Sequence, residues 1–256
     1  MTPIASAAPT PALCLAAAAV FVLAGLVKGV IGLGLPTVAM ALLALRMPPA
    51  DAAALLIVPS LATNLWQLRP LASLVPLLRR LWPLQGGAAA GTLLAAQVLG
   101  APSGAWASAS LGVVLIVYAA WAASASSPRL GARVERWSAP IAGLLTGVVT
   151  ATTGVFVVPA VPWLQALGLE REALIQALGL SFTCSTLALA AALAMEGHGS
   201  GTATMLSFAL LGPALLGMWA GQRLRPRLSP AAFRRCFLAG LAALGLYMLA
   251  EAAFAV

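Results

Sequence analysis

Apolar stretches of about 20 residues, long enough to cross a hydrocarbon core as helix, recur along the whole chain. Of its 256 residues, 62% are hydrophobic and only 8% are charged, whereas a soluble domain carries roughly 25% charged residues. Strand-like alternation of apolar and polar residues is absent. Because backbone polar groups in lipid must be satisfied within the chain, these stretches predict an all-α polytopic membrane protein.

Two of the apolar segments are interrupted by glycine. The first, at about 12–45, contains Gly32 and Gly34, and the second, at about 138–168, contains Gly154. The leg after the first break would give about 16 Å of helix, roughly half the thickness of a bilayer core. We therefore expect each segment to enter the membrane and return to the same side as a re-entrant hairpin.

The chain also resembles itself. Residues 24–31 match residues 142–149 at five of eight positions, and smaller matches continue at slowly growing offsets. Chance similarity among Ala/Leu-rich helices is the alternative to a duplication. A duplication predicts a first repeat at 1–123 (hairpin 12–45, helices 51–68, 81–99 and 103–123), a cytoplasmic linker at 124–137, and a second repeat at 138–256 (hairpin 138–168, helices 172–194, 202–222 and 232–254).

The arginines predict the orientation of the chain in the membrane. If both interrupted segments are hairpins, twelve of the thirteen arginines share one side and only Arg46 lies on the other, as the positive-inside rule requires. Each half then crosses the membrane three times, so the two repeats are inverted. We expect a bacterial inner-membrane protein with both termini periplasmic. The net charge of +8 reflects these loops and does not indicate nucleic-acid binding.

Lys28 lies inside the first interrupted segment. A cation at membrane depth is expensive and usually faces a partner of opposite charge, and helices that begin at a break present free N–H groups to anions. Alternatively, Lys28 reaches a membrane surface or a backbone carbonyl. The anion reading predicts these substrate-binding residues: Lys28, Gly32, Gly34, Asn64, Gln67, Thr152, Thr153 and Gly154.

Other polar residues lie on the same helix as members of this set or on the matching helix, and each of them has two possible roles. Asn64 and Gln67 form one stripe with Ser60 on the helix after the first hairpin, beside Thr63, and Ser181 and Ser185 occupy the matching helix. Such side chains line a translocation path or join helices by hydrogen bonds. Thr152 and Thr153 bind an oxyanion or their own helix backbone. Trp66 contacts an organic tail or anchors the chain at the interface.

Other classes of protein lack the residues that they would need. None of the six acids falls at a predicted membrane centre, which argues against a cation substrate. With one histidine, His198, in an expected loop, a membrane enzyme is the least favoured reading. Cys14, Cys184 and Cys236 have no metal-site or disulfide spacing. We expect no cofactor. A channel or a non-transporting partner subunit remains the alternative.

The pattern Ala-Gly-Leu-x-x-Gly-Val-x-Gly-x-Gly, with a second copy ending in Thr-Gly-Val-Phe-Val-Val-Pro at 153–159, resembles the TauE/SafE family of membrane permeases. Both halves of the chain share the resemblance. It implies a small anionic substrate, either an organosulfonate or a sulfur oxyanion such as sulfite or sulfate. The run at 64–67 is similar to that of toluenesulfonate uptake members, whereas the threonines of the second half depart from a frequent glycine cluster.

These observations together predict a transporter of sulfur-containing anions that works by alternating access in the lipid bilayer. The anion would bind near the midplane, where the two hairpins meet. Proton coupling and a homodimer are left open by the sequence, as is the direction of transport.

Overall fold

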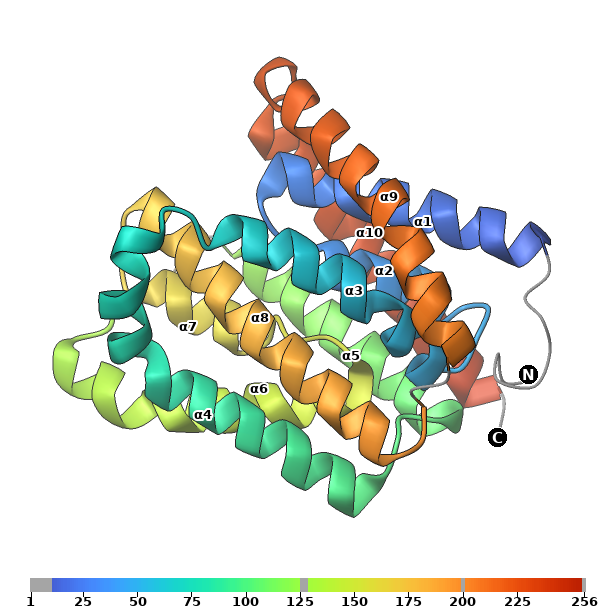
Figure 1. Cartoon of the computed structure of the whole chain (residues 1–256), viewed down its shortest axis with the longest axis horizontal. Helices are drawn as coiled ribbons and strands as arrows, with labels where there is room; N and C mark the ends of the chain where they lie inside the picture. The colour runs from blue at the N-terminus through green and yellow to red at the C-terminus, as the bar shows by residue number, and fades with distance from the viewer. Residues whose placement is uncertain (1–10, 125–128, 199–200, 255–256) are drawn as a thin grey trace.

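The structure, a computed structural model, describes residues 11–124, 129–198 and 201–254, and all regular elements in these ranges are helical (Figure 1). The first half contains α1 (Pro11–Ile31), α2 (Leu35–Leu43), α3 (Pro49–Gln67), η2 (Leu71–Ser73), α4 (Leu74–Leu99) and α5 (Gly104–Ala123). The second contains α6 (Ala132–Thr153), α7 (Ala160–Ala166), α8 (Arg171–Met195), α9 (Gly201–Leu224), η3 (Arg225–Arg227) and α10 (Pro230–Phe254).

Five helices among the described residues are long and apolar enough to cross a membrane: α1, α5, α8, α9 and α10. Helices α3, α4 and α6 have sufficient length but are not among these candidate spans. The multi-pass helical membrane protein predicted from composition is therefore confirmed.

Two helices begin earlier than apolarity alone indicates. Helix α4 starts at Leu74 instead of near residue 81, and α6 starts at Ala132 instead of near residue 138. In both cases the added turns carry charged residues, which continue a helix without difficulty beyond an apolar segment. Residues 125–128 of the expected linker lie outside the described residues.

Glycine ends a long helix at both interruptions. Gly34, with φ 110°, precedes the nine-residue helix α2, and Gly154, with φ 69°, caps the C-terminus of α6. These positive φ values favour glycine because a Cβ would clash there. Helix α2 is about 14 Å long and α7 about 10 Å, so neither spans a hydrocarbon core of about 30 Å.

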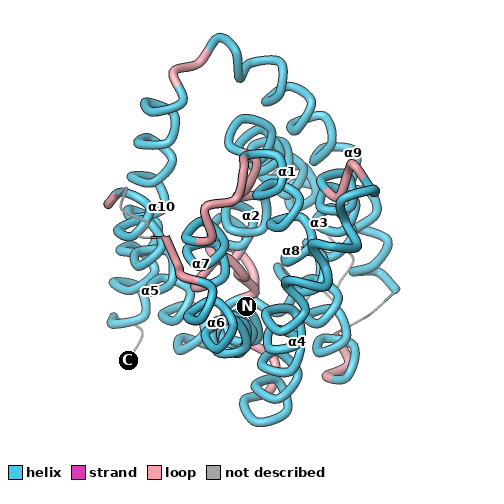
Figure 2. The backbone as a smooth tube through the Cα atoms, turned by 90° about the vertical axis from the view of Figure 1, so that its left-hand side faces the viewer, coloured by secondary structure: helices cyan, strands magenta, loops and turns pink. Residues whose placement is uncertain are grey.

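The two short helices lie in the interior of the molecule. In Figure 2, α2 and α7 sit between α5 and α10 on one side and α3 and α8 on the other. Eight of the nine residues of α2 are buried. The long helices thus enclose the chain breaks, where unpaired backbone groups can be satisfied by protein.

Two helix interfaces depend on glycine. A Cβ on Gly25 of α1 would approach the carbonyl oxygen of Ala214 on α9 to 2.2 Å, and a Cβ on Gly217 would approach that of Val22 to 2.0 Å. Backbones this close are typical of small-residue packing in membrane helices. Helices α1 and α9 are therefore joined mainly by backbone-to-backbone contact.

Helices α4 and α6 form an interface of the same kind. A Cβ on Gly143 would approach the carbonyl oxygen of Leu84 to 2.1 Å, and a Cβ on Gly87 would approach that of Pro140 to 2.4 Å. The residues of the two interfaces correspond at constant offsets. Residues 22 and 25 of α1 correspond to residues 140 and 143 of α6 at an offset of 118, and residues 84 and 87 of α4 correspond to residues 214 and 217 of α9 at an offset of 130. The two interfaces thus share one pattern of contacts, and each joins a helix of the first half to a helix of the second.

The helix ends separate into two groups. At one end, on the left in Figure 1, Arg80 of α4 bonds Glu135 of α6 at 2.6 and 2.8 Å, and Gln176 of α8 donates to two carbonyls of the α3–α4 connection. At the other end, the Glu196 carboxylate accepts from the Ala101 amide at 3.0 Å. The α9–α10 connection, at the top of Figure 1, belongs to the first group because Arg225 and Arg234 line one cavity with Arg171 of α8. We call the first group the arginine-bearing end. It carries Arg69, Arg79, Arg80, Arg129, Arg133, Arg136, Arg171, Arg223, Arg225, Arg227, Arg234 and Arg235.

Candidate functional site

Lys28 lies in the last turn of α1 and is only 2% exposed. Its ammonium group donates to the hydroxyl oxygen of Thr63 at 3.0 Å and to the carboxamide oxygen of Asn64, both on α3. The positive charge is favoured there by the negative end of the α1 dipole. Its hydrogen-bond partners are neutral, so no carboxylate among them offsets the charge.

A hydrogen bond within α3 orients the first of these acceptors. The Thr63 hydroxyl donates to the carbonyl of Pro59 at 2.7 Å, which leaves its lone pairs facing the Lys28 ammonium. Gln67, one turn further along, donates from its amide nitrogen to the carbonyl oxygen of Gly32 at 2.6 Å. The polar stripe of α3 thereby holds both the lysine and the first chain break.

Several polar atoms on this stripe have no partner within the part of the chain that the structure describes. They are the hydroxyl of Ser60, the amide nitrogen of Asn64 and the carbonyl oxygen of Gln67, all buried. The ammonium of Lys28 also uses only two of its three hydrogens for the bonds above. Buried polar groups are normally paired, so the free donors of Lys28, Asn64 and Ser60 suit a ligand that brings acceptor oxygens, whereas the Gln67 oxygen is itself an acceptor.

Helix α8 closes the stripe from the other side. A Cβ on Gly179 would come within 2.8 Å of the Gln67 Cβ and 3.2 Å of the Asn64 carbonyl oxygen, so only glycine allows this approach. Ser181 and Ser185 are buried on the same helix, and the Ser185 hydroxyl has no partner among the described residues. Nothing in the spacing of the sequence marks Gly179 as part of the site.

At the second break, the predicted donors turn toward their own helix. The Thr153 hydroxyl donates to the Val149 carbonyl at 2.6 Å, and the Thr152 hydroxyl lies 3.0 Å from the Val148 carbonyl. The structure thus has the backbone-bonded arrangement that was the alternative for these threonines. They are not among the hydrogen-bond partners of Lys28.

Gly154 connects the second break to the first half of the chain. A Cβ on Gly154 would meet Met40 of α2 at 2.8 Å and Ala53 of α3 at 3.4 Å. The two breaks are therefore linked through α2, although the structure does not bring the threonine hydroxyls to the Lys28 cluster. We use the name Lys28 cluster for Lys28, Thr63 and Asn64.

Trp66 is 58% exposed, and the Arg69 guanidinium stacks over its ring at 4.8 Å. An exposed tryptophan paired with a cation near a helix end is typical of an interfacial anchor. Of the two roles expected for this side chain, its position favours the anchor.

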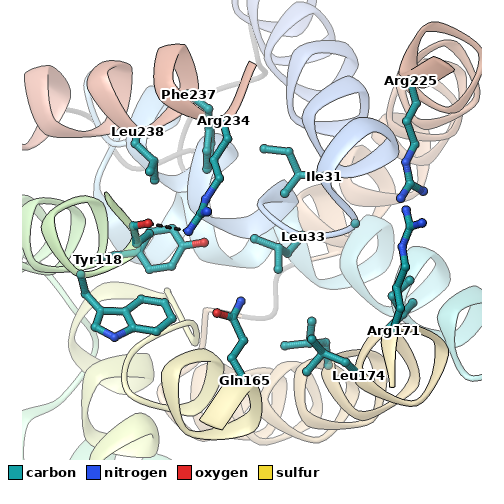
Figure 3. A pocket seen from close by; sticks show the side chains of 15 residues that line it. Ile31, Leu33, Tyr118, Gln165, Arg171, Leu174, Arg225, Arg234, Phe237 and Leu238 are labelled. Carbon is teal, nitrogen blue, oxygen red and sulfur yellow. Dashed lines mark hydrogen bonds between the residues drawn. The ribbon is translucent and has the colours of Figure 1, made fainter. Parts of the chain in front are cut away.

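A cavity of about 250 Å³ opens at the arginine-bearing end. The chain break at Gly32 and Leu33 lines it, together with Arg171, Arg225 and Arg234 (Figure 3). The sequence indicated only that these arginines lie in loops. Which of them face inward depends on helix rotation and loop conformation, and no sequence signal marks them.

A family model described as sulfite exporter TauE/SafE matches residues 17–248 of the chain. The match includes both glycine breaks, the Lys28 cluster and the arginine-lined cavity. Comparisons with curated proteins and with solved structures found no match. This chain is therefore a member of the TauE/SafE sulfite exporter family, which confirms the resemblance that its duplicated glycine motifs indicate.

Proposed function

We propose that this protein transports sulfur-containing anions across the bacterial inner membrane, with the anion bound near the midplane by the Lys28 cluster. The observation that most strongly supports this proposal is the burial of the Lys28 ammonium among neutral hydrogen-bond partners. A buried charge without a counter-charge is costly, and such residues in membrane helices mark substrate pathways. An anion that enters the cluster supplies the missing counter-charge.

The chemistry of the cluster favours an oxyanion. Ammonium, carboxamide and hydroxyl groups donate hydrogen bonds, and the unpartnered donors at Asn64 and Ser60 face no acceptor among the described residues. A sulfonate or sulfite group offers three oxygens as acceptors, which matches a site rich in donors. Family membership adds support for sulfur-containing cargo. Gln67 and the glycines of the first break complete the proposed site.

Two inverted repeats with re-entrant hairpins form the proposed architecture. The short, buried helices α2 and α7 support the hairpins because neither is long enough to span a bilayer. The doubled glycine interface supports the duplication, and it pairs the first helix of each half with the long helix of the other. Gly154, in contact with α2 and α3, brings the second hairpin to the wall of the site.

The arginine-bearing end is proposed to face the cytoplasm, by the positive-inside rule. Both termini are then periplasmic. Alternating access would rock the two repeats about the breaks, exposing the Lys28 cluster first to one side and then to the other. The glycine interfaces between α1 and α9 and between α4 and α6 are the surfaces across which the halves would move.

Uptake of labelled sulfite and of labelled toluenesulfonate by proteoliposomes tests this proposal. Lys28→Met should abolish transport by the purified, correctly folded protein, whereas Arg79→Gln, a matched loss of one positive charge at an exposed position, should not. Unlabelled anion inside the vesicles should accelerate entry of the labelled anion, because a carrier returns faster when loaded. Wild-type rates in Lys28→Met would overturn the proposed site, and absence of acceleration would favour a channel.

A further inference from the structure

We propose that the cavity at the arginine-bearing end is a second oxyanion site, separate from the Lys28 cluster, in which Arg171 and Arg225 clamp the anionic head group. Its role as a waiting position on the transport route rests on the proposed function. The binding itself does not, and it can be measured without transport.

The clamp is formed by two cations that face each other. Arg171 comes from the start of α8 and Arg225 from η3, and their guanidinium groups point toward one another at one side of the cavity (Figure 3). None of the 15 residues that line the cavity is acidic. Like charges repel at short range, so an anion between the two guanidinium groups would stabilise this arrangement.

Two other arginines of this end are held outside the cavity. Arg223 stacks over the ring of Trp219 at 4.9 Å, and Arg69 stacks over Trp66 at 4.8 Å. Both side chains are thus held by exposed aromatic rings, as expected for residues that only set the orientation in the membrane. Arg171, which is exposed, and Arg225, which is half-buried, instead line one cavity, which orientation alone does not require.

The remaining walls of the cavity indicate the rest of the ligand. Arg234 lines the opposite side and donates to the carbonyl oxygen of Ala122, while Tyr118, Leu33 and Phe237 contribute apolar surface (Figure 3). Guanidinium groups match the geometry of planar and tetrahedral oxyanions, and apolar walls favour a carbon-containing body. The site therefore fits a small oxyanion that carries an apolar group better than a bare inorganic ion.

The cavity ends where the Lys28 cluster begins. Gly32 is one of its lining residues, and the Gly32 amide donates to the Lys28 carbonyl at 2.7 Å. Lys28, Thr63 and Asn64 do not line the cavity, so the two sites are separate. The glycine break, whose carbonyl Gln67 holds, therefore adjoins both sites. Gly32 lines the cavity and follows Lys28 by one helical turn, so an anion in the cavity would wait beside the break that leads to the buried lysine.

Calorimetric titration of the purified full-length protein with benzenesulfonate and with sulfate tests the site. In the Lys28→Met background, one benzenesulfonate site should remain. Adding Arg171→Gln and Arg225→Gln should weaken it by about tenfold or more. The matched control, Arg223→Gln with Arg227→Gln, removes the same charge from the same end and should leave the affinity within about twofold. Arg225→Gln alone serves if the combined variant does not fold.

The results separate this inference from the proposed function. Loss of all benzenesulfonate binding in Lys28→Met would overturn a separate second site, and so would unchanged affinity in the arginine variants. Sulfate binding as tight as benzenesulfonate binding would contradict the assignment of the apolar walls. If the wild type transports none of the anions but the clamp variants still lose binding, the transport proposal fails while the second site stands.

Discussion

The hydroxyl of Ser207 on α9 donates to the carbonyl oxygen of Leu55 on α3 at 2.9 Å. Pro59 has no N–H group, so it cannot give this carbonyl its usual partner four residues on. The same hydroxyl oxygen accepts from the Val58 amide at 3.2 Å. The hydroxyl of a serine on a neighbouring helix thus replaces the backbone hydrogen bond that proline removes from a buried helix. This replacement lies one turn before the polar stripe that holds Lys28.

Ser207→Ala should therefore lower the free energy of unfolding by about 1–3 kcal/mol, because it leaves the Leu55 carbonyl buried without a partner. Thermal unfolding of the purified protein in detergent measures the effect. Ser185→Ala is the matched control, since that buried hydroxyl has no partner among the described residues. Equal losses in both variants would mean that the Ser207 bond contributes little.

The duplicated interface makes a paired prediction. Gly25→Ala and Gly143→Ala should each destabilise the protein by about 1–3 kcal/mol, because each new Cβ meets a backbone carbonyl that cannot move aside. Gly212→Ala is the control, since nothing lies within 4 Å of a Cβ built on that residue. It should be neutral or stabilising by up to about 1 kcal/mol through helix propensity. A strong asymmetry between the first two variants would argue against equivalent halves.

Some residues of the site could be predicted from the sequence, and others could not. Helical spacing put Asn64 and Gln67 on one face of α3, and the structure has both against the last turn of α1. Composition and glycine spacing predicted the membrane class and the family. The threonines at 152 and 153 could not be decided, since a hydroxyl serves a ligand or its own helix from the same position. Which arginines face the cavity depends on loop conformation, and residue spacing does not determine that conformation.

Topology in the membrane is open to a direct test. We expect a reporter fused to the C-terminus to be active in the periplasm, and one inserted within 124–137 to be active in the cytoplasm. The reason is the concentration of arginines at the end of the molecule where α4, α6 and α8 begin. Because positive charge sets the orientation, adding two arginines beside Arg46, on the expected periplasmic side, should weaken the preference for this orientation. A C-terminal reporter active in the cytoplasm together with a reporter within 124–137 active in the periplasm would overturn the orientation.

The partnership of Lys28 with Asn64 gives the sharpest test of the proposed site. Asn64→Asp supplies a carboxylate beside the ammonium, so it should preserve or raise thermal stability while it lowers anion transport by about tenfold or more, because the built-in anion competes with the substrate. Asn64→Leu should lower both, since the ammonium loses a hydrogen-bond acceptor without gaining a counter-charge. Measuring the melting temperature and the proteoliposome uptake of both variants separates binding from folding. If Lys28 only stabilised the fold, Asn64→Asp would transport anions as well as the wild type does.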